Sequence, residues 1–170
     1  MIKLIGFLII MVSATKIGFD FSAKYISRTK ELKAFILVLE KLKGEIKFSG
    51  NTIPEALERV SGIRVLTVEN MISYICNKVK TEGCSLDFAF KMYVEDYNAL
   101  SLSKEDIDVL TNFFSLLGTG DVDDEIKNIN SVSKTINLLL QEALEKETKY
   151  VKLYRTCGVL AGCLISIMLV

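Results

Sequence analysis

The stretch that decides the fold is DVDDEIKNINSVSKTINLLLQEA, residues 121–143. Its apolar side chains recur every three or four residues, a spacing that places them on one face of a helix. They are Val122, Ile126, Ile129, Val132, Ile136, Leu139, Leu140 and Ala143. Four carboxylates within residues 121–125 stand at the start, where the partial positive charge of a helix N-terminus favours anions. Neither Pro nor Gly follows until Gly158, so the pattern predicts one long helix from about Asp121 to the C-terminus.

The same spacing predicts five further helices upstream. An apolar stripe over residues 32–46 continues from the first apolar block without a breaker, which predicts a long first helix. Pro54 is typical of a first helical turn, and Ser85 and Ser103 are typical N-caps. Residues 68–79 carry another stripe, although residues 63–68 could instead begin as a strand. The expected fold is all-α, with about six helices.

The composition excludes several classes of protein. Lys+Arg and Asp+Glu are both 21 in a chain of 170 residues, so no basic field is available to attract nucleic acid. The chain has no histidine, which removes the commonest general base and zinc ligand. We find no nucleophile–base pair, and therefore expect no catalytic residue, no metal site and no cofactor. The sequence predicts a protein that is not an enzyme.

The apolar residues concentrate at the two ends of the chain. Residues 4–15 and 156–170 form blocks shorter than the ~20 residues that span a bilayer, although helical flanks can cover the difference. Cations follow the first block and precede the last, for example Lys16, Lys24 and Lys152, Arg155. The positive-inside rule then places both termini outside and the middle in the cytoplasm. We therefore predict transmembrane helices over 1–22 and 151–170, with a cytoplasmic helical domain over 23–150.

Two details of the end blocks fit membrane helices. Small residues lie four apart in both blocks, Ala14 with Gly18 and Gly158 with Gly162, a spacing that lets helices approach closely. Glycine is also simply frequent in membrane helices. Five aromatic residues flank the blocks where interfacial belts are expected: Phe19, Phe21, Tyr25, Tyr150 and Tyr154.

The first block has two other interpretations. It could be a core helix, or a secretory signal peptide cleaved after Ala14, which would release a secreted helical binding module. The cation bias favours the membrane helix. Elsewhere, Gly118-Thr-Gly-Asp121 lacks the lysine of a phosphate-binding loop and is best explained as the end of one helix joined to the start of the next. Cys76 and Cys84 are interpreted as free thiols.

Several stretches resemble the stage III sporulation protein AB family, relatives of the F-type inner-membrane platform proteins of type II secretion. The stretch Leu37-Val-Leu-Glu-Lys-Leu-Lys-Gly-Glu-Ile46, leading into Ile53-Pro-Glu-Ala-Leu57, is similar to the family's most specific segment. Leu117-Gly-Thr-Gly-Asp121 and Tyr154-Arg155 with Gly158 and Gly162 resemble its later segments. Two positions depart from the family pattern: Phe90 replaces a common tryptophan, and Glu125 stands where glutamine is expected.

The resemblance implies a non-enzymatic scaffold, or platform, in endospore formation. The family acts in the mother cell, in the outer forespore membrane, within a secretion-like channel complex between mother cell and forespore. The resemblance implies that the cytoplasmic domain contacts the motor ATPase of this complex, stage III sporulation protein AA, and other channel subunits; a homo-oligomer is a further expectation. It also points to Glu45, Pro54, Glu55 and Glu58 as partner-binding residues, although Pro54 has a purely structural explanation at the first helical turn.

Overall fold

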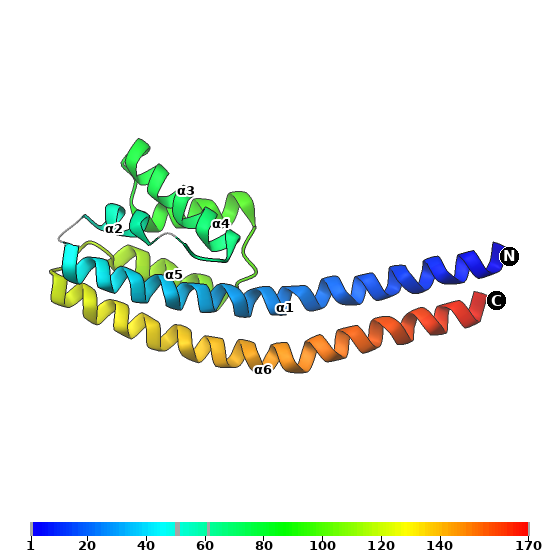
Figure 1. Cartoon of the computed structure of the whole chain (residues 1–170). Coiled ribbons are helices and arrows are strands. Elements are labelled where there is room, and N and C mark those ends of the chain that lie inside the picture. Colours follow the sequence, from blue (N-terminus) through cyan, green and yellow to red (C-terminus); the bar gives the residue numbers. More distant parts are fainter. Residues whose placement is uncertain (1, 50–51, 61, 170) are drawn as a thin grey trace. The chain divides into compact units, whose positions relative to one another are not determined.

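The computed structural model describes the backbone of residues 2–49, 52–60 and 62–169, and the side chains of residues 12–48, 52–60 and 62–165. Within these ranges the chain forms six helices and no strand, which confirms the all-α prediction (Figure 1). The helices are α1 (Ile2–Ser49), α2 (Ile53–Arg59), α3 (Leu66–Glu82), α4 (Leu86–Tyr97), α5 (Lys104–Leu116) and α6 (Val122–Leu169). The alternative of a strand starting at residues 63–68 was wrong, because α3 already begins at Leu66.

The helix boundaries follow from local capping. Thr52 is the N-cap of α2 and Pro54 lies in its first turn, where a missing N–H costs no helical hydrogen bond. Ser103 caps α5, because its Oγ accepts the N–H of Asp106 at 3.2 Å while the Asp106 carboxylate accepts the N–H of Ser103 at 2.8 Å. Gly83 ends α3 in the left-handed region at φ 65°, which glycine adopts without strain.

The chain divides into two compact units. Unit 1 consists of residues 1–29 and 142–170, and unit 2 consists of residues 30–141. Each unit therefore contains a part of α1 and a part of α6.

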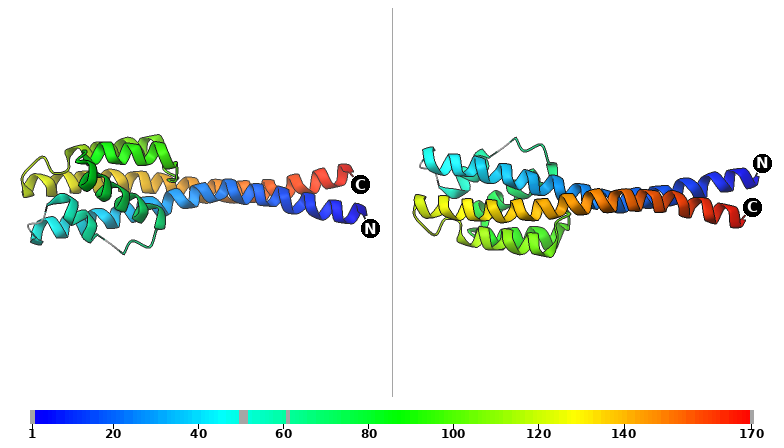
Figure 2. Two further views of the ribbon diagram at one scale, coloured as in Figure 1. Left: turned by 90° about the horizontal axis from the view of Figure 1, so that it is seen from above. Right: turned by 90° about the horizontal axis from the view of Figure 1, so that it is seen from below.

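In unit 1, the two helical segments run antiparallel and side by side (Figure 2). Their backbones come close at Gly18 and Gly158, because a Cβ built on Gly18 would lie 3.2 Å from the Cα of Gly158 and 2.7 Å from the carbonyl oxygen of Tyr154. Next to this contact, Tyr25 stacks on Tyr150 with ring centroids 5.2 Å apart. Three of the small residues singled out in the sequence, Ala14, Gly18 and Gly158, thus meet across the helix pair.

No apolar segment long enough to cross a membrane occurs in any helix, as far as the described residues go. The two predicted transmembrane helices therefore receive no support from the structure. Part of each predicted helix, residues 1–11 and 166–170, lies outside the side chains that the structure describes.

In unit 2, the shorter helices α2 to α5 pack with α1 and α6 around one apolar core. The predicted stripes supply this core: Leu32, Phe35, Leu39 and Leu42 from α1, and Ile129 and Ile136 from α6, are at most 2% exposed. Val122 is the exception, since it was predicted in the α6 stripe and is 51% exposed.

One buried carboxylate joins three parts of unit 2. Glu31 of α1 is 2% exposed, and its oxygens accept the N–H of Ser101 at 2.8 Å and the hydroxyl of Thr67 at 3.2 Å. Burial raises the pKa of Glu31, because desolvation penalises the charged form. These hydrogen bonds attach the α4–α5 connection and the start of α3 to α1.

Candidate docking groove

Three connections of the chain meet at one end of unit 2. They join α1 to α2, α3 to α4 and α5 to α6, and the ends of all six helices surround a hollow of about 620 Å³. We call this hollow the end groove. Its apolar wall comes from every element: Ile46, Ile53, Val79, Leu86, Phe114 and Val122. A hollow of this size can hold several side chains of another molecule.

The α5–α6 connection lines the end groove. Gly118 has a φ of 88°, a left-handed conformation that favours glycine, and it directly follows the last turn of α5. Asp121 then caps α6, because its Oδ1 accepts the N–H of Asp124 at 2.9 Å. The interpretation of this segment as a helix end joined to a helix start is confirmed.

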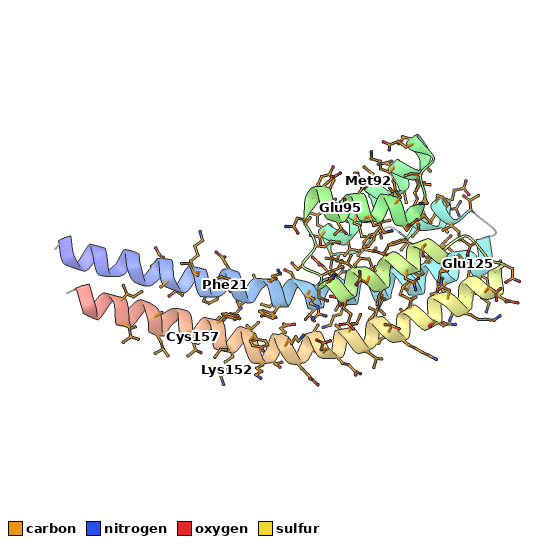
Figure 3. The ribbon with its side chains drawn as sticks, turned by 180° about the vertical axis from the view of Figure 1, so that it is seen from behind. Phe21, Met92, Glu95, Glu125, Lys152 and Cys157 are labelled. Carbon is orange, nitrogen blue, oxygen red and sulfur yellow. The ribbon has the colours of Figure 1, made fainter. Side chains whose placement is uncertain are left out.

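Glu125 holds the connection in place from within α6. Its Oε1 accepts the N–H of Gly118 at 2.7 Å and the N–H of Gly120 at 3.3 Å. Glu125 lies near the start of α6 (Figure 3). Its side chain lines the end groove and is only 4% exposed. Its second oxygen, Oε2, is buried and accepts no hydrogen bond from any residue that the structure describes.

From the sequence, Glu125 was interpreted as one acid of the helix start and as a departure from the glutamine expected at this position. The spacing of the buried residues along α6 is the signal that could have identified Glu125. Glu125, Ile129, Val132 and Ile136 are spaced by four, three and four residues and are all buried. Glu125 therefore occupies the first position of the buried face, which the pattern had assigned to Val122.

The charge of the end groove is negative. Glu125 and Asp87 are the charged side chains among the described residues that line it. Asp87 is already engaged, because it accepts a hydrogen bond from the Ser85 hydroxyl at 2.6 Å and pairs with Lys91 at 3.3 Å. The hydrogen bond from Ser85, followed by that from Lys91, lowers the pKa of Asp87, so this carboxylate stays ionised at neutral pH.

The four predicted partner-binding residues lie at different places. Pro54 lines the end groove. Glu55 is exposed, and its carboxylate accepts the N–H of Thr52 at 3.2 Å, so it stabilises the start of α2. Glu58 is exposed and pairs with Lys80. Glu45 is half-buried on α1. Their contact with a partner stays a prediction.

Glu58 borders a second, smaller hollow of about 210 Å³ between α2 and α3. The ion pair between Glu58 and Lys80 spans 2.6 Å, and both side chains are close to half exposed. It therefore contributes only ~0–1 kcal/mol to stability. Cys76 lines the same hollow, is 2% exposed and donates to the carbonyl of Pro54 at 3.8 Å. Burial, followed by the charge of Glu58, raises the pKa of Cys76 to about 11, so the thiol is protonated at neutral pH.

Comparison with known proteins identifies the family. The family model of stage III sporulation protein AB matches residues 3–170. Stage III sporulation protein AB of Bacillus subtilis is 24% identical over 170 residues, and the alignment covers 99% of each chain. A solved structure of a stage III sporulation protein AB has a TM-score of 0.64 at 18% identity, covers 72% of this chain and 98% of its own, and supports the fold. Because the family model matches almost the whole chain, the protein belongs to the stage III sporulation protein AB family.

Proposed function

We propose that the chain is a non-enzymatic scaffold subunit of the secretion-like channel complex that joins mother cell and forespore during sporulation. The observation that carries this proposal is the family match over residues 3–170. In this role, unit 2 docks the motor ATPase of the complex, stage III sporulation protein AA, and neighbouring channel subunits. The groove at the helix ends of unit 2, with its apolar wall, supports a docking role because it offers a surface that another protein can cover.

The proposal includes an anchor at each end of the chain. The apolar blocks 4–15 and 156–170 insert into the mother-cell membrane around the forespore, with both termini outside and unit 2 in the cytoplasm. Support comes from the cations that border both blocks, which match the positive-inside rule. Alkaline carbonate washing of vesicles should leave the chain in the membrane fraction. Release into the supernatant, or a mature N-terminus at Thr15 by intact mass, would contradict the anchor and favour the secreted module.

Co-purification of the full-length chain in detergent with stage III sporulation protein AA tests the docking role. We expect Glu55→Lys to weaken binding about tenfold, because charges at an interface rim steer association. Glu55→Gln is the milder comparison, since its side-chain oxygen can still accept the N–H of Thr52.

The pair of Glu58 and Lys80 separates a contact effect from a folding effect. Glu58→Lys places two cations together, whereas Glu58→Lys combined with Lys80→Glu restores the ion pair in reversed order. If Glu58 contacts the ATPase, both variants bind weakly. If only the double variant binds normally, the residue serves the fold alone. Undiminished binding by every one of these variants would remove Glu55 and Glu58 from the docking surface, and absence of binding by the wild-type chain would refute ATPase docking.

A further inference from the structure

One carboxylate oxygen of Glu125, Oε2, is buried and has no hydrogen-bond donor among the described residues. Oε1 of this carboxylate accepts two backbone N–H groups, from Gly118 and Gly120, whereas Oε2 accepts none from any part of the chain that the structure describes. The side chain is 96% buried, since its relative exposure is 4%. A buried charged acceptor without a donor is destabilising, because it has lost its hydrogen bonds to water and no donor of the protein replaces them. A donor supplied by another molecule would remove this cost.

The position of Glu125 shows from where such a donor can come. The side chain belongs to the lining of the end groove, together with apolar residues such as Ile53, Leu86 and Phe114. No lysine or arginine belongs to the described part of that lining, and the other charged member, Asp87, is an acid. The groove thus combines apolar walls with an uncompensated negative charge.

We propose that the end groove binds a segment of a partner protein that inserts a lysine or arginine toward Oε2 of Glu125 and places apolar side chains against the walls. The inference rests on the proposed docking function and names the chemistry of the docked segment. Long basic side chains fit this site, because their aliphatic stems lie along apolar surface while the charged end donates hydrogen bonds. An acidic segment would be repelled, and a bare cation would leave the apolar wall uncovered.

The variant Glu125→Gln tests the charge with little change in shape. Its side-chain oxygen can still accept the N–H groups of Gly118 and Gly120, while the negative charge is lost. Asp123→Asn is the matched control, since Asp123 is an exposed acid of the same helical turn and does not line the groove. Both variants remove one negative charge and so raise the net charge of the chain by the same amount, and a general electrostatic effect would therefore appear in both.

The probe is a set of overlapping 15-residue fluorescent peptides that covers stage III sporulation protein AA and the cytoplasmic segments of the other channel subunits. Binding to the full-length chain in detergent micelles is measured by fluorescence anisotropy. We expect at least one peptide whose affinity falls about tenfold or more with Glu125→Gln and less than about twofold with Asp123→Asn, because charge-assisted hydrogen bonds are the strong ones. The same peptide should lose affinity when its arginine is replaced by citrulline or its lysine by norleucine.

Variants of Val122 test the groove while leaving Glu125 intact, so the test does not depend on the folding of Glu125→Gln. Val122 lines the groove and is 51% exposed, so Val122→Lys can be accommodated and brings a competing cation to the site. It should weaken the same peptide more than Val122→Gln does, because both variants remove an apolar residue of the wall and only the lysine adds a cation. Circular dichroism of each variant confirms the helical fold.

The outcomes separate this inference from the proposed function. If the intact ATPase co-purifies equally well with the wild type and with Glu125→Gln, and no peptide depends on Glu125, docking stands and the groove inference is wrong. If the ATPase does not bind the wild-type chain, ATPase docking fails, while peptides from the other subunits still decide the groove. Self-association of the chain that Glu125→Gln abolishes would assign the groove to a second copy and overturn the inference.

Discussion

Replacing Gly18 by alanine tests the close approach of α1 and α6 within unit 1. The new Cβ would lie 2.7 Å from the carbonyl oxygen of Tyr154 and 3.2 Å from the Cα of Gly158. Both neighbours are backbone atoms, which cannot rotate away as a side chain can. The helices must therefore move apart, and the stacking of Tyr25 with Tyr150 must loosen with them.

Gly44 provides the matched control for the size of this effect. It lies in the same helix, and a Cβ built on it would meet nothing within 4 Å. Alanine is favoured over glycine in a helix by ~0.5–1 kcal/mol at either position. At Gly18, overpacking costs about 1–3 kcal/mol in addition. Because the helix propensity is common to both variants, the difference between them isolates the steric cost.

Hydrogen exchange measured by mass spectrometry reports each unit separately. For Gly18→Ala we expect a net loss of about 1 kcal/mol, which corresponds to roughly fivefold faster exchange in peptides from residues 12–29 and 142–165. For Gly44→Ala we expect exchange around residue 44 to be unchanged or slower. Equal protection of unit 1 in both variants would refute the close contact.

A double variant with Gly158→Ala makes the test sharper. A Cβ on Gly158 would lie 3.1 Å from the carbonyl oxygen of Ala14 and 3.2 Å from the Cα of Gly18. Once the first alanine has separated the helices, the second should cost less than it does alone. We expect a coupling of more than about 0.5 kcal/mol, and additive effects would show that the two glycines do not face each other.

Three further predictions concern unit 2. With the other three cysteines replaced by serine, Cys76 should react with iodoacetamide about 100-fold more slowly at pH 7 in the folded than in the urea-unfolded chain. The reason is that folding raises its pKa from 9.0 to about 11. Equal rates would contradict the burial of Cys76. The raised pKa of Glu31 means that the native state holds the proton more tightly than the unfolded chain. Its contribution to stability is therefore complete below the unfolded pKa of about 4.5 and is lost as the pH rises through the folded value. Urea titrations should show that the free energy of unfolding falls as the pH rises above about 4.5, and that it falls less in Glu31→Gln. Gly118→Ala should lower the free energy of unfolding by about 1 kcal/mol, since φ is 88°, and a gain in stability there would contradict the left-handed turn.

Much of the fold could be predicted from the sequence because helix signals are local. Ser85 and Ser103 occupy the N-cap positions of α4 and α5, and Pro54 lies in the first turn of α2, as their residue types predict. The long uninterrupted segments at both ends of the chain are α1 and α6. The apolar spacing then fixed most of the buried face of each helix.

The candidate site could be predicted only in part. Pro54 lines the end groove, but the groove also needs α3, α5 and α6, which are far from Pro54 in the chain. Glu55 and Glu58 were chosen for the same motif, and their nearest roles are a helix cap and an ion pair with Lys80. A pattern within one helix does not show which distant element supplies the partner of an exposed charge.

The sequence by itself determined that the chain is helical, where several of its helices begin, and which residues are small enough to let two helices meet. These properties depend on neighbours within a few positions. Only the tertiary structure decided that Gly18 faces Gly158, that Glu125 rather than Val122 starts the buried face of α6, and that three connections enclose one groove. The physical reason is that the rotation of a helix about its axis is set by close packing against its neighbours, which residues distant in the chain provide.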